Sequence, residues 1–184
     1  MNPPSHPRKE PMPAPTETGP TPTGGVPIHV RPATAEDVPA LVPLVLRLKR
    51  LNEEFDPLLK VRPDAEARAS EILAHDIADP EAVVLATEGV GADKNRIVGI
   101  VRARIRERNF YLPEREGVIL DIYLLPLYRR HGVGEYLLEE ITKAVKAKGA
   151  GVLTAEFPVQ NQIAVAFYHK RGFRPTTGLY SRPL

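Results

Sequence analysis

The strongest constraint on the fold is the segment 118–134, in which an apolar run, a proline and a basic glycine-containing turn follow one another. Residues 117–125 are almost all apolar and rich in β-branched side chains, which is typical of a central strand. Pro126 ends this strand because it has no amide hydrogen to give to a sheet. Residues 134–148 then place apolar side chains at helical spacing. The segment therefore predicts a buried strand that passes through a tight turn into an amphipathic helix.

The turn between this strand and this helix has the composition of an anion site. Gly132 and Gly134 allow the backbone to approach a bulky ligand closely. The first amides of the helix have no intrahelical partner and lie at the positive end of its dipole, so they favour phosphate. Arg129 and Arg130 add positive charge and forked donors.

Two well-known phosphate motifs do not fit the turn. A Walker loop requires a lysine directly after its last glycine, where this chain has Glu135, and a dinucleotide-binding turn requires a third glycine, where it has Leu137. The pattern R-x-x-G-x-G that begins at Arg129 instead resembles the pyrophosphate loop of the GNAT N-acetyltransferase family.

Two further segments resemble the same family, in the expected order. Residues 156–173, EFPVQNQIAVAFYHKRGF, look like the strand and helix that follow the loop, and residues 30–41, VRPATAEDVPAL, look like the first strand and helix. The resemblance covers residues 28–184. The preceding segment 1–27 holds nine of the twenty prolines and is predicted to be a disordered Pro-rich tail.

The resemblance implies an α/β (α+β) fold, with a mixed, mostly antiparallel central sheet flanked by helices. A splayed parallel strand pair would hold the cofactor. The pattern of the chain predicts the order β-α-α-β-β-β-α-β-α-β, with one or two closing strands in residues 173–184. Pro43 is expected to kink the first helix.

Alternation within residues 96–107 puts Val101, Ala103 and Ile105 on one strand face and three arginines, at 102, 104 and 106, on a solvent face. If the next strand is regular from Glu116, that glutamate shares a face with Val118 and Ile122. Asp121 then lies on the opposite face.

The family resemblance implies acetyl-CoA as cosubstrate and no metal. The backbone of the loop would bind the CoA pyrophosphate, Asn161 would contact the pantetheine arm, and the amide of Leu124 would hold the thioester oxygen. The implied cofactor-binding residues are Leu124, Arg129, Arg130, His131, Gly132, Val133, Gly134 and Asn161.

Two side chains are candidates for catalysis by the same resemblance. Tyr168 would protonate the departing thiolate, which suits a phenol with an ordinary pKa of about 10. Glu116 would serve as general base, or be a solvated glutamate of a hairpin. The acceptor pocket would form between residues 52–62 and residues 106–116.

Composition narrows the chemistry. The chain has no cysteine, which excludes disulfides, thiolate metal sites and a cysteine acyl-enzyme. The resemblance implies direct transfer in a ternary complex, and the lack of cysteine agrees with it. The net charge of +2 gives no strong argument for nucleic acid or membrane, although residues 143–184 hold seven basic residues against one acidic residue and could suit an anionic cofactor. No apolar run approaches the roughly 18 residues of a membrane span, and a cytoplasmic location is expected.

Three hypotheses follow from the sequence. The first is an N-acetyltransferase acting on a small-molecule or protein amine, with a possible homodimer. The second is a non-catalytic acyl-CoA-binding regulatory domain. The third is a nucleic-acid-binding module that uses the basic residues. The sequence does not identify the acceptor.

Overall fold

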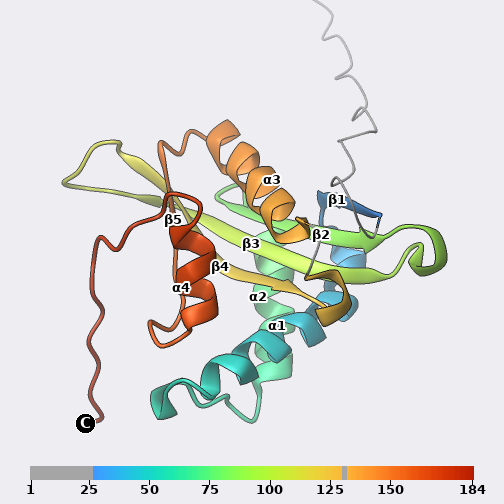
Figure 1. The fold of residues 1–184 in the computed structure, drawn as a ribbon, viewed down its shortest axis with the longest axis horizontal. Coiled ribbons are helices and arrows are strands. Elements are labelled where there is room, and N and C mark those ends of the chain that lie inside the picture. Colours follow the sequence, from blue (N-terminus) through green and yellow to red (C-terminus); the bar gives the residue numbers. More distant parts are fainter. Residues whose placement is uncertain (1–26, 130–131) are drawn as a thin grey trace, which may run out of the picture.

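The computed structural model describes residues 27–129 and 132–184 of the chain. One five-stranded sheet has the order β1-β2-β3-β4-β5, in which the first four strands run antiparallel and β5 lies parallel to β4 (Figure 1). This confirms the predicted mixed, mostly antiparallel α/β fold. The strands are β1 (Ile28–Pro32), β2 (Ala82–Gly89), β3 (Ile97–Glu107), β4 (Arg115–Leu124) and β5 (Val152–Ala155).

Helices cover both faces of the sheet. One core packs α1 and α2 against one face, and the other packs α3 against the opposite face, with Tyr168 of α4 in the same cluster. The helices are α1 (Val38–Glu53), α2 (Ala65–Ala78), α3 (Val133–Ala147) and α4 (Gln162–His169). None of the helices within the described ranges combines the length and apolarity needed to cross a membrane.

Local sequence explains where α1 begins and how it continues. Thr34 and Asp37 form a capping box around the short 3-10 turn Ala35–Asp37 that leads into α1, and the Asp37 carboxylate accepts from the Thr34 amide at 2.7 Å. The helix then runs through Pro43 without interruption from Val38 to Glu53. Its six buried apolar side chains hold it on the sheet, so packing offsets the backbone hydrogen bond that Pro43 cannot make.

The prediction of closing strands in residues 173–184 is wrong. No helix or strand follows α4 in the structure, and residues 173–184 are almost all exposed. Pro175 and Pro183 lack amide hydrogens, which breaks any continuous ladder here. The strand β5 is therefore an edge of the sheet within the described part of the chain.

A β-bulge in β4 overturns the predicted facing of two acidic residues. The register with β3 shifts because Asp121 pairs with Arg102 and Ile119 pairs with Ala103, so Leu120 is the extra residue. Because one inserted residue reverses the alternation, Glu116 shares its face with Asp121 and not with Ile122.

The predicted solvent face of β3 is also wrong for its inner arginine. The side chain of Arg102 is only 11% exposed and lies beneath α2, where it pairs with Asp76 and Asp121. Exposure increases along the strand through Arg104 to Arg106, which alone among the three is mostly exposed. The alternation of the side chains is as predicted, but the sequence did not predict that α2 covers the arginine face of β3.

Candidate active site

The parallel strands β4 and β5 separate halfway along β4. Their pairing runs from Glu116 opposite Val152 to Ile119 opposite Ala155, and the Glu156 amide still donates to the Ile119 carbonyl at 3.0 Å. The strand β4 continues to Leu124, whereas β5 has ended. The separation begins at the bulge, so the second half of β4 presents one backbone edge that β5 does not cover.

The amide of Leu124 lies on this uncovered edge. The amide of the next residue, Leu125, donates to the carbonyl of Val98 in β3 at 2.9 Å. Since successive amides of a strand point in opposite directions, the Leu124 N–H is directed away from β3. Its carbonyl accepts a hydrogen bond from Arg129 Nε at 2.9 Å, which fixes the end of the strand. A fixed backbone donor of this kind can stabilise a developing oxyanion.

The N-terminus of α3 lies beyond this strand end. Gly132 is the N-cap with φ of 78°, a left-handed conformation that favours glycine, and no side chain caps the helix. A Cβ added at Gly132 would meet no atom of the described residues within 4 Å, apart from its chain neighbours, so the described part of the chain leaves space beside this residue. The first amides of α3, which include those of Val133 and Gly134, have no intrahelical partner and could donate to an anion. Arg130 and His131 lie outside the described residues.

The start of α3 packs against α4. A Cβ added at Gly134 would lie 3.1 Å from a ring carbon of Phe167, so any larger residue would have to displace this ring slightly. Arg171 stacks on the same ring, with its guanidinium carbon 3.8 Å from the ring centroid, and forms an ion pair with Glu135 of α3. Arg171 was not identified from the sequence as a neighbour of the loop. The only sequence feature that pointed to it is its position directly before Gly172 and Phe173, in the segment that resembles the family.

Tyr168 is held in an aromatic cluster at the end of β5. Its ring stacks on Phe157 with centroids 5.0 Å apart and meets the rings of Phe167 and Phe173 edge-on at 5.1 and 5.0 Å. The residue is 5% exposed, and burial raises the pKa of its phenol above the ordinary value. Tyr168 therefore stays protonated at neutral pH, and it releases its proton less readily than a phenol of ordinary pKa.

Asn161 caps α4. Its side-chain oxygen accepts from the Ala164 amide at 3.1 Å, which leaves its two N–H donors for another partner. The cap fixes the side chain at the turn between β5 and α4, at the start of the helix that carries Tyr168.

Glu116 lies at the opposite end of β4. Eight residues separate it from Leu124, which corresponds to roughly 25 Å along a strand. Burial raises the pKa of Glu116, but hydrogen bonds from Arg106 at 2.7 Å and Thr154 at 2.8 Å outweigh it, so the pKa lies below its ordinary value. At this separation Glu116 and the Leu124 amide cannot act on the same reacting amine. Glu116 instead links β4 to Arg106 of β3 and to Thr154 of β5.

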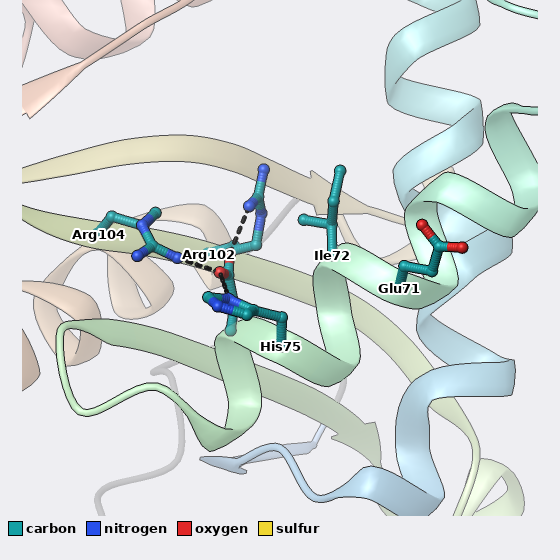
Figure 2. Close-up of a pocket in the computed structure, with 6 residues that line it drawn as sticks. Glu71, Ile72, His75, Arg102 and Arg104 are labelled. Atoms are coloured by element: carbon teal, nitrogen blue, oxygen red, sulfur yellow. Dashed lines mark hydrogen bonds and ion pairs between the residues drawn. The ribbon is translucent and has the colours of Figure 1, made fainter.

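A second polar cluster lies under α2. Figure 2 shows Arg102 and Arg104 reaching from the sheet toward the helix turn that carries His75. Asp76 accepts from Arg102 at 2.5 Å with one oxygen and from Arg104 with the other. His75, Asp76 and Asp79 have potential metal-ligand atoms within 4.8 Å of one another. Both Asp76 oxygens are already taken by guanidinium groups, whose positive charge opposes a cation.

Leu124, Val133 of α3 and Tyr168 of α4 belong to one core cluster on the α3 face of the sheet, and Arg129 bonds to the Leu124 carbonyl, whereas Glu116 lies at the other end of β4. The fold is thus a mixed α/β sheet that opens between two parallel strands beside a helix terminus suited to phosphate. The model of the acetyltransferase (GNAT) family matches residues 47–173, and the chain belongs to this family.

Similar proteins agree with this membership. The ribosomal protein bS18-alanine N-acetyltransferase of Escherichia coli K12 is 32% identical over 62 residues, which are 34% of this chain and 42% of that relative. The chain thus matches less than half the length of this curated relative.

Solved structures share the fold at low sequence identity. A predicted acetyltransferase from Clostridium acetobutylicum, solved with acetyl-CoA, has a TM-score of 0.69 at 17% identity, over 85% of this chain and 96% of that one. An aminoglycoside antibiotic 6'-N-acetyltransferase from Acinetobacter baumannii has a TM-score of 0.67 at 18% identity, over 85% and 97% of the two chains.

Proposed function

We propose that the protein is an N-acetyltransferase that moves the acetyl group of acetyl-CoA directly to an amine in a ternary complex. The observation that carries the proposal is the opening between β4 and β5 after Ile119 and Ala155, beside the uncapped start of α3. The GNAT membership of the chain and the acetyl-CoA in a structure of the same fold support it.

The described residues fit acetyl-CoA in two respects. The amides of Gly132, Val133 and Gly134 offer donors to the pyrophosphate at the positive end of α3, and the described part of the chain leaves space beside Gly132. The uncovered edge of β4 offers strand-like hydrogen bonds to the amides of the pantetheine arm, as β5 would if it continued. The side-chain N–H groups of Asn161 donate to no described residue and could donate to the same arm.

In the proposed reaction, the Leu124 amide and the Tyr168 hydroxyl act on the reacting atoms. The amine nitrogen attacks the thioester carbon, so a C–N bond forms while the C–S bond breaks and its electron pair leaves with sulfur. The Leu124 N–H donates to the carbonyl oxygen as negative charge develops on it. The Tyr168 hydroxyl then gives its proton to the thiolate, and the proton of the acetylated nitrogen passes to water.

The acceptor must attack as a neutral amine. An α-amino group with a pKa of about 8 is roughly one-tenth neutral at pH 7, whereas a lysine with a pKa of about 10.4 is neutral about four times in ten thousand. Since Glu116 lies roughly 25 Å along β4 from Leu124, it is not proposed as the base. We expect turnover to rise with pH toward the pKa of the acceptor amine.

The test is thiol release from acetyl-CoA in the presence of single amines, with mass spectrometry of the acetylated product. Amine-dependent release is expected, and Leu124→Pro, which removes the amide hydrogen, should abolish it. Leu124→Ala, which keeps the hydrogen, is the matched control and should retain most of the activity. Binding of acetyl-CoA without release for any amine would instead establish the non-catalytic acyl-CoA-binding alternative.

A further inference from the structure

A hollow of about 280 Å³ lies on the α1 side of the sheet, at the end of β4. It adjoins the strand end where Leu124 lies, but it opens on the opposite face of the sheet from α3. Its lining residues are Arg47, Arg50, Leu51, Glu54, Tyr123 and Arg129.

The α1 residues of this hollow form one helical stripe. Arg47 and Arg50 lie in the last two turns of α1, and Glu54 is its C-cap; because they are spaced by three and four residues, they lie above one another on a single face. Both arginines are exposed. No carboxylate in residues 27–129 or 132–184 lies within ion-pair distance of either guanidinium, whereas the adjacent Lys49 pairs with Asp121 at 2.6 Å.

Arg129 supplies a third guanidinium from the other wall. Its Nε bond to the Leu124 carbonyl and its position over the Tyr123 ring, 5.0 Å from the centroid, hold it in place. Only Nε is used in that bond, so the terminal nitrogens remain as donors. The hollow therefore has three arginines and one glutamate, an excess of positive charge that has no structural partner among the described side chains.

We propose that this hollow binds the acceptor and selects amines that also carry a carboxylate or phosphate group. The proposal rests on the N-acetyltransferase function above. Forked guanidinium donors match the two oxygens of such anions. An anion held by Arg47 and Arg50 would leave the amine of a short acceptor beside Tyr123, one residue from Leu124, whose amide would donate to the thioester oxygen.

The first experiment compares acceptors in matched pairs by thiol release from acetyl-CoA. Each pair is a primary amine with a free carboxylate and its carboxamide, or phosphoethanolamine and ethanolamine. We expect kcat/KM to be at least about tenfold higher for the anionic member, a difference of roughly 1.4 kcal/mol. The double variant Arg47→Ala/Arg50→Ala should abolish this preference by raising the acceptor KM. Its affinity for acetyl-CoA should stay within about twofold of the wild type, and Arg68→Ala, an exposed arginine of α2, is the control.

The second experiment does not need a turned-over acceptor. Protein saturated with CoA, so that the CoA phosphate site is already filled, is titrated calorimetrically with inorganic phosphate. We expect phosphate to bind to the wild type and not to the double variant.

Weakened acetyl-CoA binding in that variant, without an effect on the acceptor KM, would assign the arginines to the CoA phosphates and overturn the proposal. Equal use of neutral and anionic amines would overturn it too, as would the absence of both phosphate binding and anionic-amine turnover in a protein that binds acetyl-CoA. These outcomes leave the cosubstrate site intact, whereas failure to bind acetyl-CoA would remove the proposed function itself.

Discussion

Asp121→Asn tests whether a buried ion network holds α1 and α2 against the sheet. The Asp121 side chain is 0% exposed, and its two oxygens lie 2.6 Å from Lys49 of α1 and 2.6 Å from Arg102 of β3. Burial raises the pKa of Asp121, but the two cations outweigh it and hold the pKa below its ordinary value. Asp121 is thus an ionised carboxylate that links α1 and β3 to β4, and it is not suited to accept a proton.

The cost of the substitution follows from the charges that remain. Asparagine has nearly the same shape, so no cavity forms, but Arg102 and Lys49 lose their shared carboxylate. Removing one partner of a buried pair costs about 3–5 kcal/mol. Lys49 is 40% exposed and can turn toward water, which favours the lower end, about 3 kcal/mol. A chain of this length would then lose roughly 6–12 °C in Tm.

Urea and thermal unfolding of three variants measure this cost. Lys49→Met leaves the Arg102 pair intact and should cost about 1–2 kcal/mol. Glu140→Gln makes the same chemical change at a surface pair with Lys143 and should cost at most about 0.5 kcal/mol. The reasoning is refuted if Asp121→Asn is no more destabilising than Glu140→Gln.

Three further predictions concern other parts of the molecule. Tyr168→Phe should keep acetyl-CoA affinity in calorimetry while turnover falls at least about tenfold; unchanged turnover would remove the proton-donor role. Gly117→Ala should destabilise by about 1–3 kcal/mol in urea, because its Cβ would lie 2.8 Å from the Cβ of Val145. Hydrogen bonds from Arg31 lower the pKa of Asp37 to about 2, so this carboxylate stabilises the fold above pH about 4 and ceases to do so as pH falls toward 2. Wild type should lose up to about 2 kcal/mol more than Asp37→Asn over that range, and parallel pH curves would contradict this.

The elements that the sequence predicted well are those with a strong local pattern. The apolar positions of α3 predicted a helix over residues 134–148, and the structure has it at Val133–Ala147. The alternation in residues 96–107 predicted β3, observed at Ile97–Glu107. The glycine-containing turn before α3 was recognisable because left-handed backbone and uncapped helix amides depend on the residues of the turn itself.

Features that depend on distant partners could not be predicted in this way. The bulge at Leu120 is a matter of register against β3, and strand periodicity alone does not contain it. The burial of Arg102 depends on Asp76, 26 residues away along the chain. Arg47 and Arg50 line the candidate acceptor site because the fold puts Tyr123 of β4 beside them, and this contact between distant segments is not visible in the sequence.

Calorimetric titration with acetyl-CoA tests the central claim most directly. The wild type should bind with a Kd in the micromolar range, about −8 kcal/mol. Gly134→Glu should abolish binding, because it puts negative charge at the phosphate site, while Gly134→Gln, which crowds Phe167 equally, should retain measurable affinity. Thermal melts of all three proteins show whether they are folded. Absence of binding in the folded wild type would contradict both the cosubstrate site and the acetyltransferase function.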